Sequence, residues 1–149
     1  MMTGSSLRSA SSSISGCNLA AMQNFYGIAA LGGLSISGTG SLDIAGASGQ
    51  DETTGCGIMT LGEFTLQSGS VAITLGGCEI NMGLYSGGSI LVTGGTLAVK
   101  RAGTPQTIGA SMGILSETSP EELNGKSAVH ITGGTVSVQG NDLALAIDD

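Results

Sequence analysis

A motif of a bulky residue, a glycine and an aliphatic residue recurs along this 149-residue chain at nearly constant spacing. The copies are Tyr26-Gly27-Ile28, Cys56-Gly57-Ile58, Met82-Gly83-Leu84 and Met112-Gly113-Ile114, with Leu143-Ala144-Leu145 as a weaker fifth. From one copy to the next, the aliphatic residue moves by 30, 26, 30 and 31 positions. A period of this length is typical of solenoids, in which each repeat buries its apolar face against the next.

Each copy leads into two pairs of apolar residues, and the members of a pair stand two positions apart. The pairs are Leu34/Ile36 with Leu42/Ile44, Phe64/Leu66 with Val71/Ile73, Ile90/Val92 with Leu97/Val99, and Val129/Ile131 with Val136/Val138. This alternation predicts short strands with one buried face, and the glycines between them predict abrupt turns. Three strands per repeat fit a three-sided coil better than a propeller blade, which has four strands in about 40 residues.

We therefore expect an all-β fold: a right-handed parallel β-helix of three short strands per coil, with about four full coils and partial coils at each end. Each strand would pair with its equivalent one coil away, about 4.8 Å distant. Three core columns follow from the spacing: Ile28, Ile58, Leu84, Ile114, Leu145; Ile36, Leu66, Val92, Ile131; and Ile44, Ile73, Val99, Val138. Two polar ladders are predicted at the corners: Ser15, Ser37, Gln67, Thr93, Thr132 and Asn18, Ser41, Ser70, Thr96, Thr135.

The chain divides into a serine-rich polar leader over residues 1–13, expected to be poorly ordered, and β-helix repeats over residues 14–149. Ile14 would open a partial first coil. Residues 117–127 interrupt the fourth repeat, and Pro120 followed by two glutamates predicts a helical turn there. The start of the chain lacks the basic, apolar and small-residue order of a secretory signal, so a fragment of a longer repeat protein is one expectation.

Charge limits the classes of partner. Four basic residues against eleven acidic ones give a net charge of −7, which excludes the positive footprint that nucleic acids and anionic membranes require. Glycine, serine or threonine interrupts every apolar run, so we expect no membrane insertion. The three cysteines, Cys17, Cys56 and Cys78, have no metal-type spacing and are interpreted as small buried residues.

Two repeats carry a resemblance to a known family. Gly-Leu-Tyr-Ser-Gly-Gly-Ser-Ile-Leu-Val-Thr-Gly-Gly-Thr-Leu-Ala-Val over residues 83–99 and Ala-Val-His-Ile-Thr-Gly-Gly-Thr-Val-Ser-Val over residues 128–138 resemble the glycine-rich repeats of bacterial surface β-helix proteins. Among these, the chain is similar to the carbohydrate-binding β-helix family, whose members attach to plant polysaccharides. The resemblance covers about residues 26–147. It implies an extracellular or cell-surface, nonenzymatic module that can hold Ca²⁺.

The candidate binding residues lie on the first strand of each repeat. Alternation points Ala29, Met59, Tyr85, Leu115 and Ala146 away from the core, beside the column of motif glycines. Apolar outward positions over a glycine trough can stack a sugar ring or receive another protein segment. We therefore take Tyr85, Met59 and Leu115 as the candidate site, with a covering loop as the alternative interpretation.

The acidic residues offer weaker candidates. Asp51, Glu52 and Glu79 could supply carboxylates to Ca²⁺, although no aspartate-rich calcium loop is present and a solvated acidic edge is the favoured interpretation. Asp43 has no second carboxylate in its column, which contains Ala72, Ala98 and Ser137, as hydrolysis or lyase chemistry would require.

His130 is the single histidine and should face solvent, and the Thr-Gly-Gly-Thr segments at 93–96 and 132–135 are expected to be corners that tolerate positive φ, not phosphate loops.

These observations favour a nonenzymatic surface β-helix module, either carbohydrate-binding or a scaffold. The alternative is a degenerate polysaccharide lyase or glycoside hydrolase. We expect no catalytic residues and no cofactor apart from Ca²⁺. Open coil ends with apolar columns behind them also predict self-association.

Overall fold

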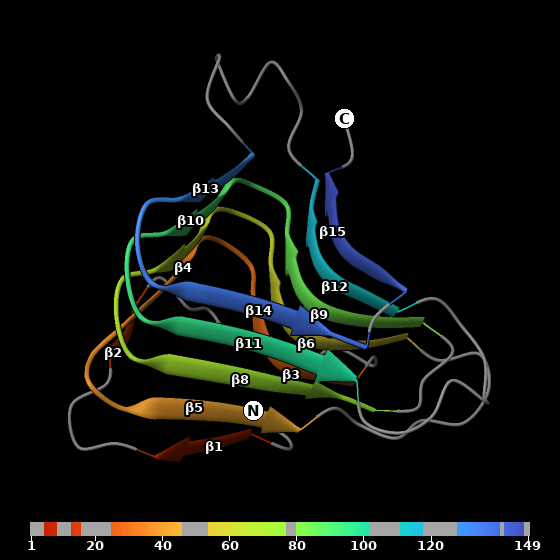
Figure 1. Ribbon diagram of the computed structural model, residues 1–149, viewed down its shortest axis with the longest axis horizontal. Coiled ribbons are helices and arrows are strands. Elements are labelled where there is room, and N and C mark those ends of the chain that lie inside the picture. Colours follow the sequence, from red (N-terminus) through yellow and green to blue (C-terminus); the bar gives the residue numbers. More distant parts are fainter. Residues whose placement is uncertain are drawn as a thin grey trace.

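The computed structural model describes residues 5–8, 13–15, 25–45, 54–76, 80–101, 111–117, 128–140 and 142–147. The described part is all-β, and its strands form three five-stranded sheets that wind around one axis (Figure 1). Each coil passes through the three sheets in turn, and successive coils stack in sequence order. This architecture confirms the predicted right-handed parallel β-helix. The sheets are called first, second and third in the order in which a coil passes through them.

The first sheet consists of β3 (Phe25–Ala30), β6 (Thr54–Thr60), β9 (Ile80–Ser86), β12 (Ser111–Ser116) and β15 (Leu143–Ile147). The second consists of β2 (Ser13–Ser15), β4 (Leu34–Ser37), β7 (Phe64–Leu66), β10 (Ile90–Val92) and β13 (Val129–Ile131). The third consists of β1 (Ser5–Arg8), β5 (Ser41–Ala45), β8 (Ser70–Leu75), β11 (Thr96–Arg101) and β14 (Thr135–Gln139).

The register between coils confirms all three predicted core columns. The first-sheet column joins Ile28, Ile58, Leu84, Ile114 and Leu145. The second-sheet column joins Ile36, Leu66, Val92 and Ile131, and the third-sheet column joins Ile44, Ile73, Val99 and Val138. A parallel ladder between equivalent strands keeps like residues side by side, and this explains why the spacing of the repeat alone locates them.

One apolar core fills the space between the sheets. Phe64, Leu66, Val71, Leu84 and Leu97 are 0% exposed, and they belong to one contiguous cluster. Burial of such a side chain contributes about 1.5–3 kcal/mol. Because each coil buries its inward side chains largely against its neighbours, the middle of the stack is covered best.

A buried ladder of hydroxyl groups closes the corner between the first and second sheets. Thr60, Ser86 and Ser116 stack in register and are 0% exposed. Each donates a hydrogen bond to the carbonyl of a corner glycine one coil earlier: Thr60 to Gly32, Ser86 to Gly62 (2.9 Å) and Ser116 to Gly88 (3.1 Å). The ladder thereby ties each corner to the preceding coil and gives the three buried hydroxyl groups hydrogen-bond partners.

The corner between the second and third sheets depends on glycine conformation. Gly69, Gly95 and Gly134 have φ values of +86°, +80° and +79°, a region that side chains with a Cβ rarely adopt. A Cβ at Gly134 would also meet the Gly95 carbonyl oxygen at 2.5 Å. The predicted positive-φ role of the Thr-Gly-Gly-Thr corners is therefore confirmed.

The N-terminal strands run against the direction of the stack. β1 pairs antiparallel with β5, and β2 pairs antiparallel with β4, so that Ile14 faces Ile36 and Ser15 faces Ser35. The predicted placement of Ser15 beside Ser37 in a parallel partial coil is wrong. A polar-apolar-polar strand such as Ser13–Ser15 presents the same pattern in either direction, so alternation does not encode its orientation.

The insert expected at 117–127 falls outside the described residues except for Glu117, which follows β12 directly. Asn18, in the second predicted polar ladder, also lies outside them; its other members, Ser41, Ser70, Thr96 and Thr135, pair in register.

Candidate binding face on the first sheet

The motif glycines of the first sheet lie close against the next coil and against the third sheet. Figure 1 shows β9, β12 and β15 turning sharply within their length. A Cβ on Gly83 would collide with the Gly113 carbonyl oxygen and with Val99 Cγ1, a core side chain of the third sheet. The glycines thus admit third-sheet side chains from the inside. The interpretation of this column as an outer trough for a ligand is corrected accordingly.

The outward strip predicted on the first sheet exists in register. Ala29, Met59, Tyr85, Leu115 and Ala146 pair successively through the five strands. Ala29, Met59 and Leu115 are only 5%, 8% and 7% exposed. Ala29, Met59 and Cys56 form a second apolar cluster, separate from the core, against which Tyr26, Met82 and Tyr85 pack.

Of the three candidate residues, Met59 and Leu115 are therefore almost fully buried and offer little surface to a ligand. Tyr85 is half-buried and offers more surface.

A second outward column follows the strip two residues later and was missed by the sequence analysis. It contains Leu31, Leu61, Gly87 and Glu117, and backbone hydrogen bonds join its successive coils. Leu31 is 49% exposed and Leu61 is 51% exposed. The signal was available, because these residues continue the same alternation past the end of the predicted strand.

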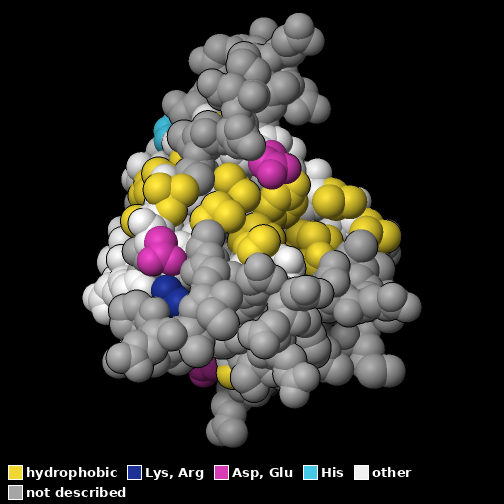
Figure 2. All heavy atoms as spheres, turned by 90° about the vertical axis from the view of Figure 1, so that its right-hand side faces the viewer, with side chains coloured by type: hydrophobic (Ala, Val, Ile, Leu, Met, Phe, Trp, Pro, Cys, Tyr) yellow, Lys and Arg dark blue, Asp and Glu magenta, His cyan; other side chains and the backbone are white. Residues whose placement is uncertain are grey.

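Figure 2, which views this side of the molecule, shows hydrophobic side chains gathered on it with acidic side chains at the margin.

Tyr85 and Glu117 connect the two columns. The Tyr85 hydroxyl donates a 2.6 Å hydrogen bond to Glu117 Oε2, across one coil. This bond to a carboxylate, together with desolvation and the negative charge of Glu117, raises the pKa of Tyr85 to about 12. Gly87 contributes no side chain between Leu61 and Glu117. A Cβ at Gly87 would meet the Leu61 carbonyl oxygen at 2.8 Å, so the glycine allows the two coils to approach closely. An aromatic ring, a carboxylate and an exposed leucine thus lie on the same face.

A second carboxylate lies near the corner of the preceding coil. Glu63 accepts hydrogen bonds from Ser89 Oγ (2.8 Å), in the next coil, and from Thr65 Oγ1 (3.2 Å), in its own coil. All three groups are on the exposed surface. The pattern is that of a surface hydrogen-bond network that connects two successive coils.

Cys56 lies under the outer face. The residue is 4% exposed, and its thiol donates a hydrogen bond to the Ile58 carbonyl oxygen at 3.2 Å. Burial raises the pKa of the thiol to about 12, so the nucleophilic thiolate is suppressed near neutral pH. The prediction that this cysteine packs as a small buried residue is confirmed. Cys17 and Cys78 lie outside the described residues.

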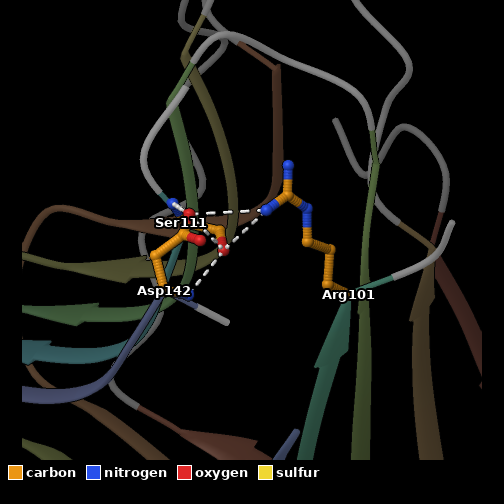
Figure 3. A network of polar contacts seen from close by, with 3 residues as sticks. All are labelled: Arg101, Ser111 and Asp142. Atoms are coloured by element: carbon orange, nitrogen blue, oxygen red, sulfur yellow. Dashed lines mark hydrogen bonds and ion pairs between the residues drawn. The ribbon is translucent and has the colours of Figure 1, made fainter. Parts of the chain in front are cut away.

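A polar network fastens the last strand of the first sheet (Figure 3). Asp142 Oδ2 accepts hydrogen bonds from the Ser111 amide (2.9 Å) and hydroxyl (3.2 Å), and the Asp142 amide donates to Ser111 Oγ at 3.1 Å. Arg101 Nη1 lies 3.4 Å from the same carboxylate oxygen. The backbone hydrogen bond from Ser111 is the main cause of the lowered pKa of Asp142. The sequence analysis missed this network because Asp142 and Arg101 belong to different columns.

The remaining candidates do not join this face. Asp51, Glu52 and Glu79, the weak Ca²⁺ candidates, lie outside the described residues. Asp43 is exposed on the third sheet in register with Ala72, as predicted, and His130 is exposed on the second. Among the described residues, no group of three histidine, cysteine or acidic side chains is arranged to hold a metal ion.

Comparison with protein-family models, with curated proteins and with solved structures found no match. Within the described ranges, no helix is long and apolar enough to cross a membrane.

Proposed function

We propose that this chain is a nonenzymatic β-helix module that binds a neutral carbohydrate on the outer face of the first sheet, around Tyr85. The observation that carries the proposal is the hydrogen-bonded pair of Tyr85 and Glu117, on the same face as the exposed Leu61. Sugars present an apolar C–H face and a rim of hydroxyl groups. An aromatic ring suits the face, and a carboxylate accepts hydrogen bonds from the rim.

Packing supports a preformed site. The side chains of Met59 and Leu115 are 8% and 7% exposed, and they flank Tyr85 from either neighbouring coil and hold the strip in place. A site supported by buried neighbours on rigid strands needs little reorganisation when it binds.

Charge favours a neutral ligand or one bridged by Ca²⁺. The chain carries a net charge of −7, and Glu117 lies at the site itself, so an unaccompanied polyanion would be repelled. The resemblance to carbohydrate-binding surface β-helix proteins points to the same ligand class and to a cell-surface setting.

An oligosaccharide array tests the proposal. Wild-type protein is applied to neutral and acidic plant-type oligosaccharides with and without Ca²⁺, together with the Tyr85→Ala and Leu91→Ala variants. Leu91 lies on β10 in the same coil but in the second sheet, and it serves as the matched control. We expect binding to neutral glycans that Tyr85→Ala weakens and Leu91→Ala preserves.

Absence of binding to every glycan would contradict the proposal. A product assay on the same polysaccharides addresses the enzymatic alternative, because release of oligosaccharide would identify a lyase or hydrolase. In that case, truncation of Asp43, Asp51 or Glu52 should abolish turnover and leave binding largely intact.

A further inference from the structure

The last coil exposes core positions that earlier coils bury. β13, β14 and β15 are the outermost strands of the three sheets at one end of the stack. Ile131 is 51% exposed whereas Val92, its partner in the preceding coil, is 1% exposed. Leu145 is 46% exposed whereas its partner Ile114 is 4% exposed. This end therefore presents the surface that each coil elsewhere presents to its successor.

The three strands at this end carry none of the residues that usually protect a sheet edge. Their sequences, Val-His-Ile, Thr-Val-Ser-Val-Gln and Leu-Ala-Leu-Ala-Ile, contain no lysine, arginine, aspartate, glutamate or proline. Edge strands without charges or prolines are templates for pairing with another chain. At the opposite end, the antiparallel strands β1 and β2 close two of the three sheets. The two ends of the stack are therefore different.

We propose that the end formed by β13, β14 and β15 is a self-association surface, and that it takes the same end of a second copy of this chain. Like the contact between successive coils, this contact would pair strand edges and bury apolar columns against another β-coil. Two identical ends meet about a twofold axis, which sets their edge strands antiparallel. None of the eleven acidic residues lies on these three strands, so strand pairing at this end sets no carboxylate of a strand directly opposite another.

The middle strand locates the axis. In a full antiparallel overlap of β14 with its copy, the central residue, Ser137, lies opposite itself. Its side chain continues the outer column of Asp43, Ala72 and Ala98 on the third sheet. A lysine at this position would place two like charges side by side across the interface, which destabilises a strand pair.

Sedimentation velocity over a concentration series tests the proposal with the wild-type chain, Ser137→Lys and Ala72→Lys. Ala72→Lys adds the same charge to the same column two coils away from the interface. We expect a dimer that dissociates on dilution, with a dissociation constant at least tenfold weaker for Ser137→Lys and unchanged for Ala72→Lys. Circular dichroism establishes that the variants remain folded.

Amide hydrogen exchange provides a readout that does not depend on a variant. At high concentration, amides of β14 should exchange more slowly than at low concentration. A strict monomer throughout the series would overturn the proposal. So would a dimer that protects the outer face of the first sheet and leaves β14 unchanged, or one weakened equally by the two lysines.

Discussion

The Tyr85 hydroxyl donates a 2.6 Å hydrogen bond to the Glu117 carboxylate, and this contact links two consecutive coils on the outer face of the first sheet. It unites the only aromatic residue of the outward strip with a residue that the sequence analysis had placed in an insert. Because the bond holds the phenol in its neutral form, the pair has a measurable signature in alkaline solution.

Ultraviolet titration of tyrosinate should detect this signature in a Tyr26→Phe background, where Tyr85 alone is observed. We expect a pKa of about 12, against an ordinary value of 10.0, and a lower value in Glu117→Gln. The pKa of Tyr85 is raised in the folded state, so the contribution of Tyr85 to the stability of the fold is fully present below pH 10 and is lost as the pH rises towards 12. An identical titration in the two proteins would show that Glu117 is not the cause.

The core columns predict a large contrast between adjacent residues. Val92 is 1% exposed, whereas Thr93 is exposed. Val92→Asp should therefore lower the free energy of unfolding by about 2–5 kcal/mol, and Thr93→Asp should change it little. Ile131→Asp should fall between them because Ile131 is 51% exposed. Urea denaturation followed by circular dichroism measures all three. Equal stability of Val92→Asp and Thr93→Asp would refute the column assignment.

Two glycines with different surroundings predict a second contrast. Gly83→Ala would drive a Cβ into the Gly113 carbonyl and Val99, whereas Gly32→Ala meets nothing within 4 Å. We expect Gly83→Ala to cost about 1–3 kcal/mol or more, as overpacked sites do, and Gly32→Ala to be nearly neutral. Thermal melts of the two variants provide the comparison. If Gly32→Ala lowered the stability as much as Gly83→Ala, the close contact of Gly83 with Val99 would not be the reason why a glycine is needed there.

The repeat predicted the stack because in a parallel β-helix the same sequence position meets itself in the next coil. Ile58 lies beside Leu84 because the two residues occupy the same position in consecutive repeats, 26 residues apart. The same logic was sufficient for Tyr85 beside Leu115.

Contacts between different positions of the coil were not predictable in this way. Tyr85 reaches Glu117 diagonally, and Arg101 reaches Asp142 from another sheet. The antiparallel direction of β2 was also hidden, since alternation is symmetric under reversal. Exposure differed from the prediction at Met59, because outward side chains packed on one another form a cluster of their own.

The Asp142 network predicts local loosening of the last strand of the first sheet. Asp142→Ala removes the acceptor for the Ser111 amide and for Arg101, so amides of β15 should exchange faster while those of β9 remain protected. Asp43→Ala, at an exposed aspartate of the third sheet, is the control.

Acid should produce the same loosening in the wild-type chain. The pKa of Asp142 is lowered in the folded state, so its contribution is present above the ordinary pKa of 3.8 and is lost as the pH falls through the lowered value. Exchange at β15 that is indifferent to Asp142→Ala would show that the strand is held by its ladder alone.

The most direct test of the account is the equilibrium affinity of wild type, Tyr85→Phe and Tyr85→Ala for the best neutral glycan from the array, measured by titration calorimetry. If the ring supplies the stacking surface, Tyr85→Ala should weaken binding about tenfold, and Tyr85→Phe, which keeps the ring, should retain most of the affinity. Leu91→Ala should bind as wild type does. Equal affinities for wild type and Tyr85→Ala would contradict the assignment of the outer face of the first sheet as the binding site.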